Sequence, residues 1–314
     1  MYWQIREILR TLNVVPDAQT LVVDLPRSNF LSGLFFNYKA TTGTTAGQIT
    51  MPAYLTNISV IADGSTEIFS MAGEDIILSN YGLWNHLMPC SIAIASGSTT
   101  YFTGVIPFGR FLGDPNFYLD CGRYASLELR VTFNPTVAAT GIATGTQYFT
   151  VHGLMAMESP PAVRMGTLKT ARKFKFTSSS SGDVVLDLPR GNVYRALQIL
   201  DIGAGKILDA GYSRVQLDVN NGEKTIFAGD VLTLRKLIRA LSKEGWALAE
   251  TATTGPISCA PTATTQGDEL TIPFDIADDI SYCLNSAQFG KVNLTLSQAA
   301  SGHDTRVILQ EILS

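Results

Sequence analysis

One internal repeat constrains the fold of this chain more than any other feature. The peptide Asp24–Asn29 (Asp-Leu-Pro-Arg-Ser-Asn) returns 163 residues later as Asp187–Asn192 (Asp-Leu-Pro-Arg-Gly-Asn). Further matches follow in the same order, at spacings between 158 and 166 residues: Ile58–Gly64 with Gln216–Gly222, Glu67–Phe69 with Thr225–Phe227, Ile106–Phe108 with Ile272–Phe274, and Leu119–Asp120 with Leu284–Asn285. Solenoid and propeller repeats are much shorter, so the sequence predicts two copies of one domain.

Each copy contains about eight strand-like runs separated by turn signals. The clearest run alternates strictly, with Leu127, Leu129, Val131 and Phe133 predicted to point inward, and its partner in the second copy has Val292, Leu294 and Leu296. Such alternation is typical of strands with one buried face. Eight antiparallel strands in two packed sheets describe a jelly roll, so we predict an all-β protein of two tandem jelly-roll sandwiches. A pair of seven-stranded immunoglobulin-like sandwiches is the alternative.

A helix inserted after the fourth strand of each copy favours the jelly roll. In the second copy, apolar residues fall at helical spacing: Leu234, Leu237, Ile238 and Leu241. The first copy offers a similar stripe: Ile77, Tyr81, Trp84 and Met88. We interpret both stripes as faces that pack on the core.

Two segments outside the sandwiches are candidate contact sites. Residues 1–13 are predicted to form an amphipathic helical arm, ahead of a first jelly roll at 14–160. Residues 161–172 are predicted to form a basic linker before a second jelly roll at 173–314. We expect the arm to dock under a neighbouring subunit or on an anionic membrane, with packing on its own domain as the alternative. We interpret the linker as a solvated connector, with contact to lipid headgroups or nucleic acid as the alternative. The candidate residues are Tyr2, Trp3, Ile5, Arg6, Ile8, Leu9 and Arg10 in the arm and Arg164, Lys169, Arg172 and Lys173 in and beside the linker.

Composition excludes several other classes. The net charge of −4 argues against a general nucleic-acid binder, which needs a basic surface. The first residues lack the apolar stretch of a signal peptide, and Pro, Gly, Ser and Thr interrupt the uncharged stretch 87–109. The four cysteines form no CxxC pair, so we expect reduced thiols and neither a disulfide scaffold nor a metal site.

The sequence contains no recognisable catalytic constellation. A two-domain cupin would need several histidines with a carboxylate, and the three histidines (His86, His152 and His303) are isolated. No nucleophile elbow, phosphate-binding loop or HExxH helix is present. We therefore expect no enzyme activity and no cofactor. Two Thr-rich loops, Thr136–Gln147 and Thr251–Gly267, are candidates for exposed recognition loops.

The duplicated order of strands, with a helix after the fourth, resembles the double jelly-roll major capsid proteins of tailless icosahedral viruses, including internal-membrane bacteriophages and the adenovirus hexon family. The resemblance covers nearly the whole chain and rests on this architecture and on the repeat of Asp24–Asn29 as Asp187–Asn192. It implies a structural protein whose homotrimers have a pseudo-hexagonal outline and tile an icosahedral shell.

The resemblance also implies a set of partners and a location. The partners would be further copies of the chain, penton or minor capsid proteins and, in members with one, an internal lipid membrane, without sequence-specific contact to nucleic acid. The location would be the virion capsid, after synthesis and assembly in the host cytoplasm. A viral spike or a carbohydrate- or receptor-binding sandwich is the alternative function, since such modules use similar folds.

Overall fold

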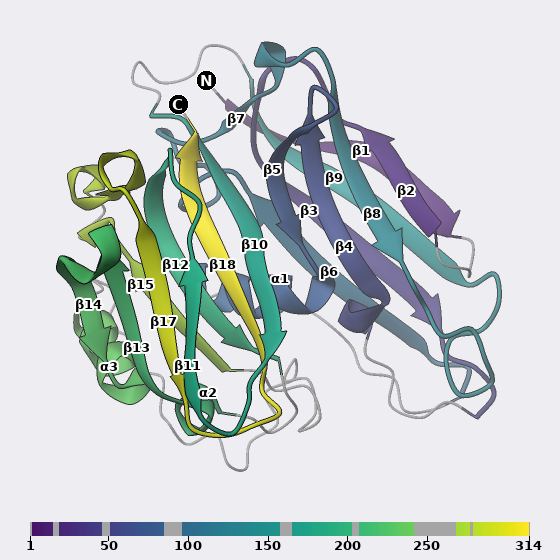
Figure 1. The fold of residues 1–314 in the computed structure, drawn as a ribbon. Coiled ribbons are helices and arrows are strands. Elements are labelled where there is room, and N and C mark those ends of the chain that lie inside the picture. The colour runs from purple at the N-terminus through teal and green to yellow at the C-terminus, as the bar shows by residue number, and fades with distance from the viewer. Residues whose placement is uncertain are drawn as a thin grey trace. The chain divides into compact units, whose positions relative to one another are not determined.

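A computed structural model describes residues 2–14, 19–45, 51–84, 96–157, 165–202, 207–241, 268–276 and 279–313. The chain divides into two compact units, one of Met1–Ala171 and one of Arg172–Leu313. The described strands form three hydrogen-bonded sheets of five, nine and four strands, and each unit taken by itself has two layers of antiparallel strands (Figure 1).

Unit 1 has nine strands among its described residues. One sheet has the order β1 (Tyr2–Val14), β9 (Gln147–Met157), β3 (Phe30–Thr41) and β6 (Thr99–Pro107), with the short β7 (Leu119–Asp120) also paired to β3. The other has the order β5 (Thr66–Met71), β4 (Leu55–Ala62), β8 (Leu127–Phe133) and β2 (Gln19–Asp24). Helix α1 (Gly73–Trp84) follows β5.

Unit 2 repeats this arrangement. Its first sheet has the order β10 (Thr167–Thr177), β18 (Asp304–Leu313), β12 (Val193–Asp201) and β15 (Asp268–Pro273), with β16 (Leu284–Asn285) paired to β12. Its second sheet has the order β11 (Gly182–Asp187), β17 (Val292–Gln298), β13 (Tyr212–Val219) and β14 (Lys224–Gly229). Its helices are α2 (Leu208–Gly211) and α3 (Val231–Leu241), and it has 3-10 turns at Asn220–Gly222, Ile280–Tyr282 and Ser286–Gln288. Unit 1 has 3-10 turns at Met51–Tyr54 and Cys121–Arg123.

The two units match strand by strand, even in their irregularities. A β-bulge interrupts the β4–β5 hairpin between Val60 and Ile61, and a bulge interrupts the β13–β14 hairpin at the corresponding place, between Leu217 and Asp218. Both hairpins turn through an Asp-Gly or Asn-Gly pair in which both residues have positive φ. Because bulges fix the local register and twist, their repetition supports duplication of one ancestral domain. The prediction of two jelly rolls is confirmed.

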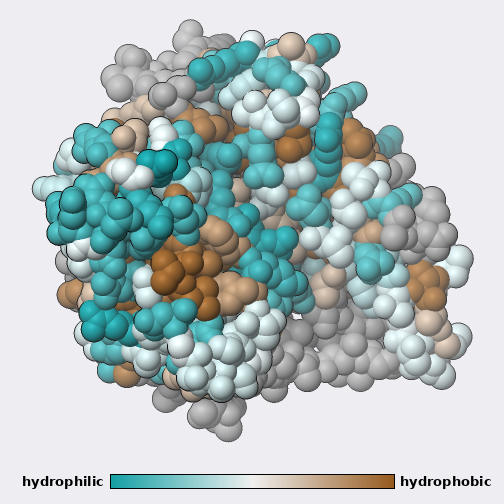
Figure 2. Space-filling view, in the orientation of Figure 1, coloured by the Kyte–Doolittle hydropathy of each residue, from teal (hydrophilic) through white to brown (hydrophobic). Residues whose placement is uncertain are grey.

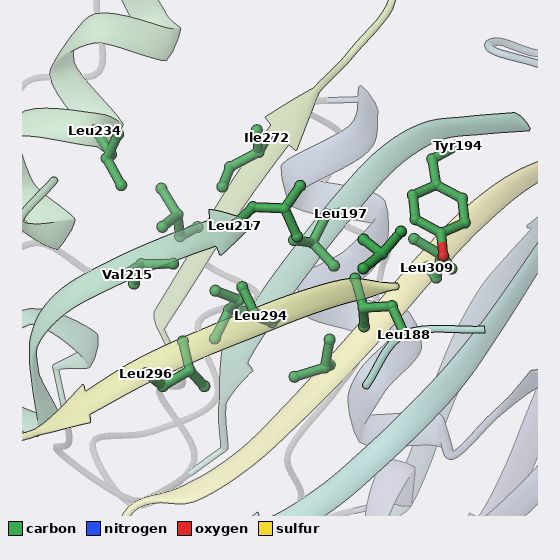
Figure 3. Packing of buried hydrophobic residues seen from close by; sticks show 14 of the residues in the cluster. Leu188, Tyr194, Leu197, Val215, Leu217, Leu234, Ile272, Leu294, Leu296 and Leu309 are labelled. Carbon is green, nitrogen blue, oxygen red and sulfur yellow. The ribbon is translucent and has the colours of Figure 1, made fainter. Parts of the chain in front are cut away.

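The cores lie between the two sheets of each unit. In unit 2, apolar side chains from both sheets point toward one another, among them Leu217, Leu294 and Leu309 (Figure 3). In unit 1, aromatic rings contribute more: Phe149 contacts Phe133 and Phe36 at centroid distances of 5.4 and 5.6 Å. The predicted alternation of Leu127–Phe133 is confirmed, since every second residue is buried.

Both predicted helices are present where expected. Helix α3 packs Leu234 and Ile238 on the core, whereas Leu237 is exposed. Helix α1 buries Ile76 and Ile77 and ends at Trp84. The side chains predicted to extend this stripe, Tyr81, Trp84 and Met88, lie outside the described residues, as does that of Leu241.

The prediction of an N-terminal helix is wrong. Residues 2–14 form strand β1, which pairs with β9 along its length. Two register shifts, between Glu7 and Leu9 and between Leu9 and Leu12, break the two-residue period of the strand. The apolar residues therefore recur at a spacing that imitates a helix. The aromatic and β-branched residues at the start, such as Trp3 and Ile5, favour a strand.

The prediction of a solvated linker is also wrong in its described part. Residues 167–172 belong to strand β10, and the division between the units falls inside this strand, after Ala171. Strand β10 lies beside β18 as β1 lies beside β9, so the predicted arm and the predicted linker are the same element in two copies. Among the described residues, each copy thus has the eight predicted strands and one more.

The repeated Asp-Leu-Pro-Arg peptide serves the same structural purpose in each unit. Its leucine is buried, and its arginine binds a backbone carbonyl ahead of the next-to-last strand. The bonds are Leu25 N to Leu127 O (2.8 Å) and Arg27 Nη1 to Ala125 O (3.1 Å), and Leu188 N to Val292 O (2.8 Å) and Arg190 Nη1 to Gly290 O. These contacts account for the peptide without a functional role.

Replacing a central core residue tests the packing of unit 2. Leu294 is fully buried on β17, so Leu294→Ala removes contacts and leaves a cavity. We expect the free energy of unfolding to fall by about 2–5 kcal/mol, measured by urea denaturation followed by circular dichroism. Val185→Ala is the control, because Val185 on β11 is 57% exposed. Equal midpoints for the two variants would contradict the assigned core.

Candidate assembly surfaces

The candidate residues of strand β1 divide between its two faces. Ile5 is 70% exposed, and Arg6 and Arg10 are exposed as well. Ile8 is half-buried and packs over Gly153 of β9, where a Cβ atom would lie 2.9 Å from Ile8 Cδ1. The remaining candidates are Trp3 and Leu9, which are half-buried, and Tyr2, whose side chain lies outside the described residues. Contact of β1 with a partner or a membrane stays a prediction, and it no longer rests on an amphipathic helix.

The basic candidates on strand β10 are not free surface charges. Lys169, Arg172 and Lys173 are all half-buried, and Arg164 lies outside the described residues. Lys173 Nζ lies 2.9 Å from a carboxylate oxygen of Glu311 on β18, and the Glu311 side chain is only 2% exposed. The other carboxylate oxygen accepts a hydrogen bond from Asn192 at 3.0 Å. Lys173 therefore compensates a buried charge within unit 2.

The first sheet of unit 1 has an outer face that is open to solvent. Lys39 of β3 pairs with Tyr148 of β9 on one side and with Tyr101 of β6 on the other, and all three side chains are exposed. Farther along the same face, His152 lies 3.9 Å from Glu7 and its side chain is 40% exposed. We call this row of Lys39, Tyr101, Tyr148 and His152 the open face.

The corresponding strands of unit 2 are buried on both sides. Every residue of β12 after Val193 is buried, whereas β3 alternates between buried and exposed positions in its second half. His152 of β9 corresponds in register to Ile308 of β18, which is fully buried. Equivalent surfaces of the two copies are thus in different environments within one chain.

Exposed apolar groups are dispersed on the side of the molecule seen in Figure 2. Brown areas there are separate and are bordered by hydrophilic residues. This view therefore offers no continuous apolar face that would mark an obligate interface by itself. Strand edges and the mixed open face are better candidates for contacts between subunits.

Backbone hydrogen bonds, one within the loop and one to strand β3, order the first Thr-rich loop. Ile142 N and Ala143 N donate hydrogen bonds to Thr136 O and Thr41 O, at 3.0 and 2.8 Å. Beside the loop lies a hollow of about 420 Å³. Its described lining contains no titratable side chain and consists of Thr41, Thr42, Gly43, Thr44, Ser96, Gly97 and Ala143. The second loop, Thr251–Gly267, lies outside the described residues, so exposed recognition by either loop stays a prediction.

The histidines do not build a metal centre in the described ranges. His303 is buried and its Nδ1 binds the carboxylate of Asp201, which is also buried. His152 is on the open face, and His86 lies outside the described residues. In the part of the chain that the structure describes, no three His, Cys, Asp or Glu side chains are grouped closely enough to hold a metal ion. No described helix combines the length and apolar character needed to cross a bilayer.

The Lys173–Glu311 pair can be tested by removing one charge at a time. Lys173→Met leaves the buried Glu311 carboxylate uncompensated, so we expect a loss of about 3–5 kcal/mol in the free energy of unfolding. Lys173→Met/Glu311→Leu should recover most of this loss. Lys175→Met is the control, because Lys175 is 53% exposed and lies 3.9 Å from Asp304, a pair expected to contribute at most about 1 kcal/mol. Chemical denaturation measures all three, and similar losses for Lys173→Met and Lys175→Met would refute the assignment.

Solved structures share the fold over the whole chain, although no family model and no curated protein matches the sequence. The crystal structure of the STIV MCP is 13% identical with a TM-score of 0.66, covering 99% of this chain and 97% of that chain. The major capsid protein P2 from bacteriophage PM2 is 14% identical with a TM-score of 0.61, covering 100% of this chain and 98% of that chain. The PBCV-1 virus capsid is 10% identical with a TM-score of 0.63, covering 100% of this chain and 95% of that chain. The chain therefore has the double jelly-roll fold of these viral capsid proteins.

Proposed function

We propose that this chain is a structural major capsid protein whose homotrimers, pseudo-hexagonal in outline, tile an icosahedral viral shell. One observation carries the proposal: viral capsid proteins match the chain over nearly its full length and nearly theirs, with TM-scores of 0.61 to 0.66. A shared sandwich in one unit would be weak support, because such domains serve many functions. Agreement in two consecutive units, with both chains almost fully covered, is much more restrictive.

The duplication itself suits a hexagonal lattice. Three copies of a chain with two similar units present six similar bodies around one axis, so true threefold symmetry becomes pseudo-sixfold. Upright sandwiches placed side by side can bury large lateral surfaces. The open face of unit 1 is such a lateral surface, since its aligned side chains are polar or amphipathic and already ordered on a sheet.

The described chemistry fits a structural role. The hollow beside the first Thr-rich loop offers hydroxyl and backbone groups but no acid, base or nucleophile with a perturbed pKa. A shell protein needs rigid, complementary surfaces instead, and the matched cores of both units supply rigidity. We place the protein in the virion capsid after synthesis in the host cytoplasm, with penton or minor capsid proteins as further partners and an internal membrane as a candidate contact of β1.

The native mass of the purified protein tests the proposal. We expect light scattering to give three times the 33.9 kDa of one chain, and negative-stain images of the same peak to show a hexagonal outline. A stable monomer would overturn the proposed trimer. An elongated trimer with one narrow end would favour a spike instead, and a glycan array would then test the carbohydrate-binding alternative.

A further inference from the structure

In unit 1, the start of strand β10 completes a sheet edge. Thr170 and Ala171 pair in parallel with Phe69 and Ser70 of β5, the outermost strand of the β5–β4–β8–β2 sheet. Just before them, the carbonyl of Gly166 accepts a hydrogen bond from Tyr118 N at 3.3 Å. The Thr167 hydroxyl donates to the carbonyl of Tyr118 at 2.8 Å. The incoming strand therefore contacts both the edge of β5 and the segment just before β7.

Unit 2 contains the same receiving site. The matching bulges of the two hairpins align Phe69 with Phe227 and Ser70 with Ala228 on β14. The equivalent pairing of β7 with β3 and of β16 with β12 aligns Leu119 with Leu284. Phe117 lies two residues before Leu119, and Tyr282 lies two residues before Leu284, so Phe117 corresponds to Tyr282. Edge strand β14 and Tyr282 together form what we call the open edge of unit 2.

The burial of the two sites differs sharply. In unit 1 the receiving residues Phe69 and Phe117 are 1% and 0% exposed. In unit 2 Tyr282 is 62% exposed, Ala228 is exposed, and Phe227 is only half-buried. Strand β14 is the last strand on its side of the sheet, with β13 as its only paired neighbour in the part of the chain that is described. Such an edge presents backbone N–H and C=O groups to any strand that fits.

The counterpart of the incoming strand is equally uncovered. Strand β1 occupies the place in unit 1 that β10 occupies in unit 2, at the outer side of the last strand of its copy. The incoming residues of β10, Thr167, Leu168, Thr170 and Ala171, are at most 1% exposed. In contrast, residues 4–7 of β1 are all exposed, and Ile5 reaches 70%.

We infer that residues 4–8 of β1 add in parallel to the open edge of unit 2 in a second copy of this chain. This contact would reproduce, between chains, the pairing that β10 makes with β5 inside unit 1. Strand addition of this kind supplies main-chain hydrogen bonds for affinity and side-chain positions for specificity. The inference rests on the proposed homotrimer. In a ring of three chains, each β5 edge pairs with β10 of its own chain and each β14 edge pairs with β1 of a neighbouring chain, so neither β1 nor β14 stays unpaired.

Cysteine cross-linking tests the contact. Glu7 on β1 has a side chain that is 54% exposed, and Ala228 on β14 is exposed, so Glu7→Cys and Ala228→Cys should be tolerated. The double variant is treated with a short bismaleimide and run on a denaturing gel, with each single variant and the unmodified chain as background. Glu7→Cys/Val185→Cys is the matched control, because Val185 is 57% exposed and lies on β11, at the other edge of the same sheet.

The inference predicts covalent trimers from the double variant, because each chain is then linked at both ends to a neighbour. The single variants and the unmodified chain measure the background from the native cysteines, among them half-buried Cys283, and the Val185 control should give no trimers above that background. A native trimer by light scattering that yields no more covalent trimer than the control would overturn the strand contact and leave the proposed function intact. A native monomer would overturn both.

Discussion

Every strand at the edge of a sheet carries backbone donors and acceptors on one side without a strand partner, and the structure is organised around this constraint. Each unit has two sheets and therefore four edges. In unit 1, the chain covers the edge at β5 with the beginning of its own next copy, through Thr170 and Ala171. Among the described strands, none does the same for β14, so the duplication leaves one donor strand, β1, and one receiving edge.

The conserved part of the duplication is the backbone path, and the side chains vary around it. The bulge after Val60 returns after Leu217, and the Asp-Leu-Pro-Arg turn binds the same carbonyl region in both units. The cores nevertheless differ, since aromatic rings cluster around Phe149 in unit 1, whereas the core of unit 2 is mostly aliphatic with a few aromatic residues such as Tyr194 and Phe274. Sandwich cores tolerate such exchange when volume and alternation are maintained. This accounts for a fold shared with capsid proteins at identities of 10% to 14%.

The sequence predicts the regular parts of the fold well. The alternation of Leu127–Phe133 depends on local period alone and is confirmed. Of the predicted stripe on α3, Leu234 and Ile238 pack on the core, whereas Leu237 is exposed, contrary to the prediction. The sequence predicts a helix where strand β1 lies, because the bulges of β1 give its apolar residues a helical spacing. Only the pairing with β9 distinguishes the strand from a helix. The sequence predicts a linker where strand β10 begins, because the Lys and Arg residues there resemble those of a solvent-exposed connecting segment. The ion pair of Lys173 with Glu311 joins residues far apart in the sequence, so no local pattern predicts it. Open edges likewise follow from topology and leave no mark in a single sequence.

The position of β10 also bears on the order in which the protein forms during synthesis. Unit 1 is complete only when residues 166–171 have been made, because they hold Tyr118 and pair with β5. A ribosome must therefore translate the start of the second copy before the first can close. A fragment that ends at residue 160 would leave the edge of β5 and the backbone of Tyr118 without these partners. Before residues 166–171 are made, the unpaired edge of β5 favours association between unfinished chains. The interval between residues 160 and 171 is short, so this stage of synthesis is brief.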